Sequence, residues 1–153
     1  MAYSLRQAIA EDFWQIHKLN EAFAHFIKTP EKFKITVEQM IEEQAHFRIF
    51  VIEQDDKEII AFATTFIAWY SWIGKTMYLD DLYVTSQHRK KGLGKMLLDH
   101  IIERARQEKC KKVHWQVSKW NTNAIEFYEK YGAIVDEVES NCDYLLLSSE
   151  ESF

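Results

Sequence analysis

Proline and glycine are scarce in this chain of 153 residues, which has one proline and four glycines. Flexible linkers and low-complexity tails are rich in these residues, so the sequence predicts one domain over residues 1–153. The two cysteines, Cys110 and Cys142, are too few for a disulfide framework and lack the spacing of a metal site. The six histidines share no ligand spacing, and we therefore expect no metal.

Long apolar runs and excess positive charge are also lacking. No run is long enough to cross a membrane, and the first residues are not typical of a signal peptide, so we expect a cytoplasmic protein without a membrane partner. The net charge of -5 argues against non-specific nucleic-acid binding, which depends on counterion release by a basic surface. It mildly favours a cationic substrate.

The segment Tyr78–Arg106 reads as a strand, a basic loop and a helix. Aromatic and branched residues flank Asp80 and Asp81 and indicate a strand. Apolar residues recur every three or four positions over Leu97–Ala105, which is typical of an amphipathic helix. The loop between them consists of Arg89, Lys90, Lys91, Gly92, Leu93, Gly94 and Lys95.

This loop is basic at a position where helices favour acids. A helix N-terminus carries partial positive charge and unpaired N–H groups, so four cations there are unfavourable without an anionic ligand. Gly92 and Gly94 allow the backbone to approach a phosphate closely. We interpret the loop as a pyrophosphate cradle; the alternative is a solvated turn before an amphipathic helix.

The rest of the chain alternates between strands and helices. Further strands are predicted at Tyr3–Ala8, Phe47–Glu53, Ile59–Tyr70, Val113–Val117, Ile134–Val138 and Tyr144–Leu147. The last two are expected to pair with each other, and Gln54–Lys57 is expected to form a hairpin turn. Helices are predicted after Ala10, after Thr36 and over Asn121–Tyr131. This order predicts an α/β sheet domain with helices on both faces.

Three helix ends have recognisable signals. Thr36 and Gln39 match a capping box. Asn123 with Glu126 is expected to cap the last helix, and Gly132 is expected to end it.

Two motifs resemble a known superfamily. Arg89-x-x-Gly92-x-Gly94, between a strand and a helix, resembles the acetyl-CoA signature of the GNAT N-acetyltransferases. Trp120-Asn121 followed by Ala124–Ala133 looks like the C-terminal motif of the same superfamily.

Two further stretches, Trp72–Lys75 and Tyr78–Val84, resemble the diamine (spermidine/spermine and thialysine) acetyltransferases. The resemblance implies a GNAT-like fold: a mixed, largely antiparallel central sheet with helices on both faces and a splayed central strand pair. It also implies a homodimer, and the aromatic residues around Ile67–Ile73 suit an interface with a partner copy.

The resemblance implies that acetyl-CoA is the cofactor. Backbone groups of Leu82, Tyr83 and Val84 would then hold the pantetheine and the thioester carbonyl. The pyrophosphate would be bound by the loop, through Arg89, Lys90, Lys91, Gly92, Leu93, Gly94 and Lys95. Asn121, Ala124 and Lys130 fall at positions that touch the cofactor in the family.

The resemblance also implies catalytic roles. Tyr128 would protonate the leaving thiolate, and Asp80 would draw a proton from the amine, through water. Asp80 replaces the glutamate of the diamine enzymes and is one methylene shorter. Those enzymes also carry acids just after their first helix, whereas Ala24–Lys28 has none, which weakens the case for a polyamine substrate.

Chemistry alone supports these roles in outline. An amine is protonated near neutral pH, so a nearby carboxylate has to accept its proton before attack. Adjacent strand residues face opposite sides of a sheet, so only one of Asp80 and Asp81 should lie in a given cleft. A backbone bulge beside them would free N–H groups to stabilise an oxyanion. The alternatives are an exposed strand end for the aspartates and a core aromatic for Tyr128.

The leading function is therefore acetyl transfer to a primary amine of a small molecule: a diamine, a polyamine or a lysine-like amino acid. The first alternative is a transferase for a protein N-terminus or a lysine side chain, which needs an open groove rather than a closed acidic pocket. The second is a module that binds acetyl-CoA without turnover. Asp80 and Tyr128 argue against this module, because simple binding needs neither residue.

Overall fold

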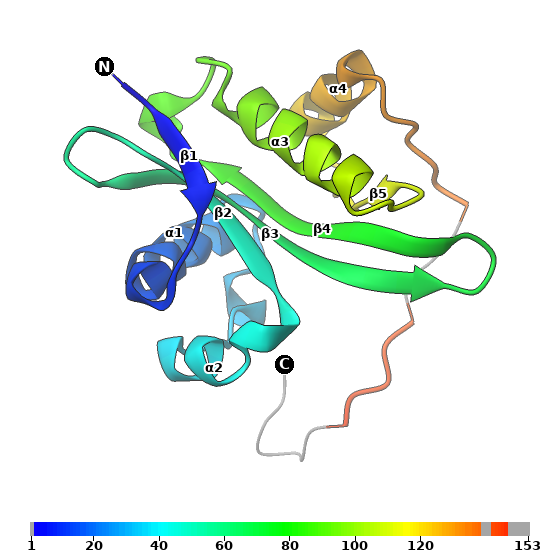
Figure 1. Cartoon of the computed structure of the whole chain (residues 1–153), viewed down its shortest axis with the longest axis horizontal. Helices are drawn as coiled ribbons and strands as arrows, with labels where there is room; N and C mark the ends of the chain where they lie inside the picture. The colour runs from blue at the N-terminus through cyan, green and yellow to red at the C-terminus, as the bar shows by residue number, and fades with distance from the viewer. Residues whose placement is uncertain (1, 139–141, 147–153) are drawn as a thin grey trace. The chain divides into compact units, whose positions relative to one another are not determined.

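The computed structural model describes residues 2–138 and 142–146. Contacts within the chain group it into two compact units, residues 1–116 and 117–153. The first unit contains a five-stranded sheet in the order β1-β2-β3-β4-β5 (Figure 1). Its strands are β1 (Ser4–Gln7), β2 (Arg48–Glu53), β3 (Ile59–Tyr70), β4 (Gly74–Val84) and β5 (Val113–His114).

The sheet is antiparallel except at one edge. β1 to β4 pair in antiparallel order, and β4 pairs with β5 in parallel. The predicted hairpin turn is confirmed, because the Lys57 N–H bonds the Gln54 carbonyl between β2 and β3. At the far end of β3, Tyr70 pairs with Gly74, whose φ of 98° suits a residue without a side chain.

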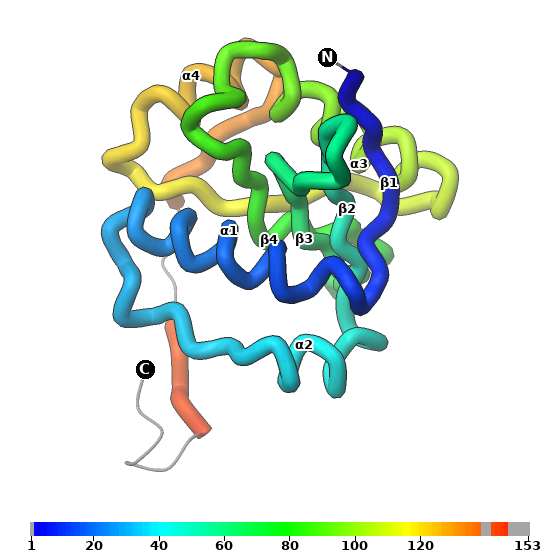
Figure 2. The backbone as a smooth tube through the Cα atoms, turned by 90° about the vertical axis from the view of Figure 1, so that its left-hand side faces the viewer, coloured from blue at the N-terminus to red at the C-terminus, as the bar shows by residue number. Residues whose placement is uncertain are grey.

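Helices cover both faces of this sheet, as predicted. They are α1 (Phe13–Phe26), α2 (Val37–Glu42) and α3 (Leu93–Gln107), with short 3-10 turns at Ala10–Asp12, Pro30–Lys32, Gln44–His46 and Ser86–His88. α3 lies on one face, while α1 and α2 lie side by side on the other (Figures 1 and 2). The capping box at α2 is confirmed: the Thr36 hydroxyl accepts from the Gln39 N–H, and the Gln39 side chain accepts from the Thr36 N–H.

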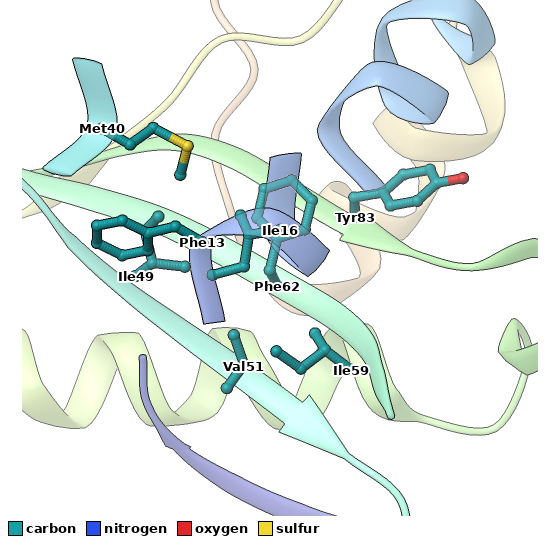
Figure 3. Packing of buried hydrophobic residues seen from close by; sticks show 8 residues of the cluster. All are labelled: Phe13, Ile16, Met40, Ile49, Val51, Ile59, Phe62 and Tyr83. Atoms are coloured by element: carbon teal, nitrogen blue, oxygen red, sulfur yellow. The ribbon is translucent and has the colours of Figure 1, made fainter. Parts of the chain in front are cut away.

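The core between the sheet and α1 is apolar and closely packed. Figure 3 shows residues from two helices and three strands converging on one cluster, namely Phe13, Ile16, Met40, Ile49, Val51, Ile59, Phe62 and Tyr83. On the opposite face, α3 buries Leu97, Leu98 and Ile101 completely. Because β4 is held by packing on both faces, it is a rigid support for functional side chains.

The second unit contains α4 (Thr122–Tyr131), and Gly132 ends this helix with φ of 109°, as predicted. Its cap differs from our expectation. The Asn121 side chain accepts from the Ala124 N–H, so Asn121 rather than Asn123 is the N-cap. The predicted helix included Asn121, but this residue precedes the first helical turn and uses its side chain to satisfy a free N–H group.

Three strand predictions were wrong in extent or existence. β5 has only two residues instead of Val113–Val117. Ile134–Val138 and the described part of Tyr144–Leu147 are not strands; Leu147 itself lies outside the described residues. Ile134 and Tyr144 are more than 90% exposed. Branched and aromatic residues favour strands only where a partner edge and a packed face are available.

Candidate active site

The two aspartates of β4 lie at a β-bulge. Thr64 of β3 pairs with Asp81 while Thr65 pairs with Leu79, so Asp80 is the extra residue of β4. A bulge bends its strand and re-aims its side chains. Our expectation of a bulge beside the aspartates is confirmed, and it places irregular backbone at the centre of the sheet.

The bulge interrupts the regular pairing on which we based the expectation that the sheet separates Asp80 from Asp81, and that expectation stays a prediction. Alternation of side chains requires regular pairing, which the extra residue interrupts. Burial raises the pKa of the Tyr78 phenol, and the negative charges of Asp80 and Asp81 raise it further.

Burial, with the charge of Asp80, raises the pKa of Asp81 to about 7. Asp80 is exposed to solvent. The surrounding protein nevertheless reduces the hydration of its carboxylate, which raises the pKa above the ordinary value. A carboxyl with a pKa near 7 is half ionised at neutral pH, which suits proton exchange with an amine. The pair can therefore attract a cation and take up a proton.

The strands β4 and β5 separate beside these aspartates. Met77 pairs with Val113 and Tyr78 with His114, and no strand within the described residues pairs with this edge of β4 beyond Tyr78. The splayed strand pair implied by the resemblance is thus present. It leaves the edge of β4 from Leu79 to Val84 without a neighbouring strand, including the backbone of Leu82, Tyr83 and Val84.

Aromatic rings continue the site toward the tip of the β3–β4 hairpin. Phe66 stacks on Tyr78 with ring centres 4.9 Å apart, and His114 lies 5.6 Å from Tyr78 and 6.1 Å from Tyr70. The Lys112 ammonium lies 5.6 Å from the centre of the Tyr70 ring. The cluster therefore has acids at one end and a cation at the other.

An open depression of about 370 Å³ adjoins this cluster through Phe66. Its lining residues are Ala45, His46, Phe47, Arg48, Phe66 and Ile67. Because Phe66 also stacks on Tyr78, the depression and the aromatic cluster share this ring.

The basic loop has the geometry of an anion cradle. Lys90 and Gly92 adopt left-handed conformations, with φ of 62° and 79°, and Gly92 is the N-cap of α3. In this fully described helix, no side chain caps the N-terminus and the first turn has no acid. A Cβ on Gly92 would meet nothing within 4 Å, so the space beside its backbone is open. Left-handed residues before a helix turn successive N–H groups to one side, and this fits a diphosphate.

Two cationic side chains of the loop point elsewhere. Arg89 donates to the Val84 carbonyl at 3.0 Å, and its guanidinium lies 4.4 Å from the centre of the Phe26 ring. Lys95 pairs with Asp99 along α3 at 2.8 Å. The backbone N–H groups rather than these two side chains are therefore the features aligned for an anion. Lys90 and Lys91 lie in the loop, whereas Leu93 and Gly94 form the start of α3 instead of loop, and Leu93 is buried. Their roles toward the cofactor stay predictions.

The second unit carries the other predicted site residues. Burial raises the pKa of Tyr128 to about 12, so its phenol stays protonated at neutral pH and can donate a proton. Asn121 caps α4 through Ala124, and Lys130 is exposed near its C-terminal end. Roles for Tyr128, Asn121, Ala124 and Lys130 toward the cofactor stay predictions.

The described part of the chain offers neither a metal site nor a membrane span. Among the described residues, no group of three side chains is arranged to hold a metal ion. In the same residues, no helix combines the length and the apolarity that a membrane span requires.

A comparison with protein families agrees with the features of this site, namely the bulged acidic strand and the cradle at a helix N-terminus. A model of the acetyltransferase (GNAT) family matches residues 7–133. The chain belongs to this family. Its members use acetyl-CoA as cosubstrate, and the cradle of the GNAT chain fits the diphosphate of that molecule.

Relatives with assigned activities are similar at modest identity. The GNAT chain is 25% identical over 140 residues to the thialysine N-epsilon-acetyltransferase of Mus musculus, covering 84% of this chain and 82% of that enzyme. It is 31% identical over 114 residues to an L-ornithine N5-acetyltransferase of Arabidopsis thaliana, covering 74% of this chain and 48% of that enzyme. The chain thus spans about half of the plant enzyme.

Solved structures show the same fold. An aminoglycoside acetyltransferase from an uncultured soil metagenomic sample, in complex with sisomicin, superposes with a TM-score of 0.77. Sequence identity is 19%, and the match covers 95% of this chain and 97% of that chain. The mixed α/β GNAT fold, predicted from the motifs, is confirmed.

Sequence reasoning missed the aromatic cluster next to the acids. Phe66 and Tyr78 are far apart in sequence, and His114 reaches them only through the parallel pairing of β5. Alternation along β3 and β4 could have placed Phe66 and Tyr78 on one face, given the hairpin register. No signal in the sequence gave the position of His114.

Proposed function

We propose that this GNAT protein transfers an acetyl group from acetyl-CoA to a primary amine of a small molecule, by direct attack of the amine. The observation that carries the proposal is the acidic pair on the β4 bulge, where Asp81 has a pKa of about 7. Binding of acetyl-CoA without turnover does not require a carboxyl group whose pKa is near neutral pH. Acetyl transfer to an amine does require one, because only the neutral amine attacks and its proton has to be accepted.

The two aspartates divide the work on the acceptor. Asp80 is exposed and meets the incoming ammonium group first. The pKa of Asp81 lies near neutral pH, and its carboxylate takes the proton directly or through water. Backbone N–H groups at the bulge stabilise the developing oxyanion.

The remaining predicted residues act on the acetyl donor. N–H groups from Lys90 to Lys95 bind the pyrophosphate, and the edge of β4 from Leu82 to Val84 holds the pantetheine arm. Tyr128 gives its proton to the leaving thiolate, in keeping with a phenol that burial keeps protonated. Acetyl-CoA supplies the activated acetyl group, and no metal takes part.

The acceptor is a diamine, a polyamine or a lysine-like amino acid, and the charge arrangement favours the last. The aromatic cluster runs from Asp81 toward Tyr70, where Lys112 lies over the ring. Lys112 would repel a second ammonium group at that end, whereas it would attract a carboxylate. The similar thialysine and ornithine acetyltransferases are named for amino-acid acceptors, which supports an amino acid as the acceptor of this chain.

The deciding experiment measures free thiol released from acetyl-CoA with putrescine, spermidine, spermine, lysine, ornithine, thialysine and one N-terminal peptide. Saturable turnover with a small amine supports the proposal, and preference for the amino acids supports the role of Lys112. Turnover with the peptide alone would favour a protein acetyltransferase. Tight CoA binding without turnover of any acceptor would favour the binding module.

Tyr128 is tested by its replacement with phenylalanine, with Tyr131→Phe on the same helix as the matched control. Loss of the phenol proton should lower kcat roughly 100-fold or more and leave CoA binding intact. The control should behave like the wild-type protein. An unchanged rate for Tyr128→Phe would remove this residue from the mechanism.

A homodimer is part of the proposal. The tip of the β3–β4 hairpin exposes Trp69 by 72% and Trp72 by 96%, with Ile67 and Ile73 also exposed. Such an apolar tip suits burial against a second copy. Light scattering of the wild-type protein and of Trp72→Ser tests this: the wild type should have twice the chain mass. A cytoplasmic location stays a prediction.

A further inference from the structure

The side chain of Arg89 is occupied within the protein fold. Its Nε donates to the carbonyl of Val84, the last residue of β4, at 3.0 Å. Its guanidinium lies 4.4 Å from the centre of the Phe26 ring and 5.5 Å from that of Tyr83. One side chain thus joins the cradle loop, the end of β4 and the end of α1.

The loop that Arg89 begins needs such an anchor. Lys90 follows directly in a left-handed conformation, which is unfavourable for a residue with a side chain. Gly92 is left-handed as well, so the loop has little regular structure of its own before α3 begins. Fixing the residue immediately before Lys90 limits the conformations that this backbone can adopt without a ligand.

The other end of the contact is the C-terminal end of α1. Phe26 is the last residue of α1, and Phe23 of the same helix stacks on Tyr83 with ring centres 5.3 Å apart. Tyr83 follows the acidic pair by two residues on β4 and belongs to the core under α1. Arg89 therefore links α1 and the end of β4 to the backbone that presents N–H groups to an anion.

We infer that Arg89 is a positioning residue that acts through Phe26: it pre-forms the cradle and makes acetyl-CoA affinity depend on the end of α1. A direct ligand of phosphate would affect binding through its own charge and would be indifferent to Phe26. The inference rests on the proposed function, because it assumes that the cradle binds the diphosphate of CoA.

The test is a double-mutant cycle on CoA affinity, measured by calorimetry with the full chain. Phe26→Leu should weaken CoA binding roughly three- to tenfold, the range expected for loss of a cation–π contact that is partly exposed. In the Arg89→Met background, the same change at Phe26 should have no further effect. Phe26→Trp, which keeps an aromatic face for the guanidinium, should retain affinity close to that of the wild type.

Trp14→Leu is the matched control. Trp14 also lies on α1 and also carries a cation over its ring, Lys18 at 5.9 Å, but it lies at the start of the helix, whereas Phe26 is its last residue. This change should leave CoA affinity unchanged. In steady-state assays, Phe26→Leu should raise the KM for acetyl-CoA and leave kcat within about twofold, which a general loss of folding would not do.

Two results would overturn the inference while leaving the proposed function intact. One is wild-type affinity for CoA in Phe26→Leu. The other is additive losses from Arg89→Met and Phe26→Leu, which would make Arg89 a direct phosphate ligand. Failure of the wild-type chain to bind CoA would instead overturn the proposed function, and this inference with it.

Discussion

Tyr78 pairs with His114 across the parallel strands β4 and β5, and this is the last pair before the two strands separate. Two residues later, Asp80 forms the bulge that bends β4. The bulge gives a physical reason for the short β5, because a strand that bends away cannot hold a straight partner. The part of β4 that carries the acidic pair has no partner strand on this side among the described residues.

The first prediction concerns the pH dependence of acetyl transfer. Asp81 must be ionised to accept a proton, so kcat/KM should rise about tenfold per pH unit below its pKa and level off above about 7. Asp81→Asn should remove this limb and lower the rate roughly 100-fold. Asp55→Asn, in the exposed β2–β3 turn, should leave the profile unchanged. A wild-type rate independent of pH between 5 and 8 would exclude Asp81 as the base.

The second prediction concerns stability and the same carboxyl. Because its pKa is raised above the ordinary value of 3.8, the folded state binds more protons than the unfolded state between about pH 4 and 7. This group therefore favours unfolding increasingly as pH rises through that window. Asp81→Asn should raise Tm at pH 8 and leave it nearly unchanged at pH 4, as measured by calorimetry. An equal change at both pH values would contradict the raised pKa.

The third prediction separates the cradle from backbone strain in general. Gly92→Ala and Gly74→Ala each place a side chain at a positive φ and should each cost about 1–2 kcal/mol of unfolding free energy. Only Gly92→Ala should weaken CoA binding, because Gly74 lies in the β3–β4 turn. Chemical unfolding and calorimetric CoA titration of both variants measure the two effects. Equal losses of CoA affinity would show that the cradle has no special role.

The fourth prediction concerns the cap of α4. Asn121→Ala removes the acceptor for the Ala124 N–H and should lower the unfolding free energy by about 1 kcal/mol. Asn123→Ala should change it by less than about 0.5 kcal/mol, because this residue lies in the first turn of the helix and not at its cap. Urea unfolding of both variants measures the difference. A larger loss of unfolding free energy for Asn123→Ala than for Asn121→Ala would show that Asn123 is the cap, as we expected from the sequence.

The fifth prediction concerns the link between β2 and α3. Arg48 donates two hydrogen bonds to Glu108, at 2.7 and 2.8 Å, with about a quarter of each side chain exposed. Arg48→Met should lower the unfolding free energy by about 1–2 kcal/mol at pH 7. The guanidinium lowers the pKa of Glu108, so this stabilisation is present above pH 4.5 and is lost as pH falls through the lowered value.

The measurement for this ion pair is urea unfolding at pH 7 and pH 3. The wild-type protein should lose its advantage over Arg48→Met at the lower pH. Glu103→Gln, on the exposed face of the same helix, serves as the control and should change stability by less than about 0.5 kcal/mol. A difference between wild type and Arg48→Met that is constant with pH would show that packing, not charge, is responsible.

Local rules of chain geometry account for what the sequence by itself determined. Strand-favouring residues bounded by a turn predicted β3 with its correct ends, Ile59 and Tyr70, and the glycines of the cation-rich loop indicated where α3 begins. The capping box of Thr36 and Gln39 and the end of α4 at Gly132 depend on neighbours within a few residues, and they were correct for that reason.

Tertiary structure alone decided the features that depend on distant partners. Whether a strand-prone segment becomes a strand depends on its pairing with another strand, and Ile134–Val138 is not paired with any strand among the described residues. The position of the bulge depends on the register between β3 and β4, and it set the environment of Asp80 and Asp81. The contact of Arg89 with Phe26 joins a loop and a helix that only packing brings together. Rules that consider only neighbours along the chain cannot predict such contacts. The sequence therefore indicated which residues have reactive or charged groups, and the fold decided what each of them contacts.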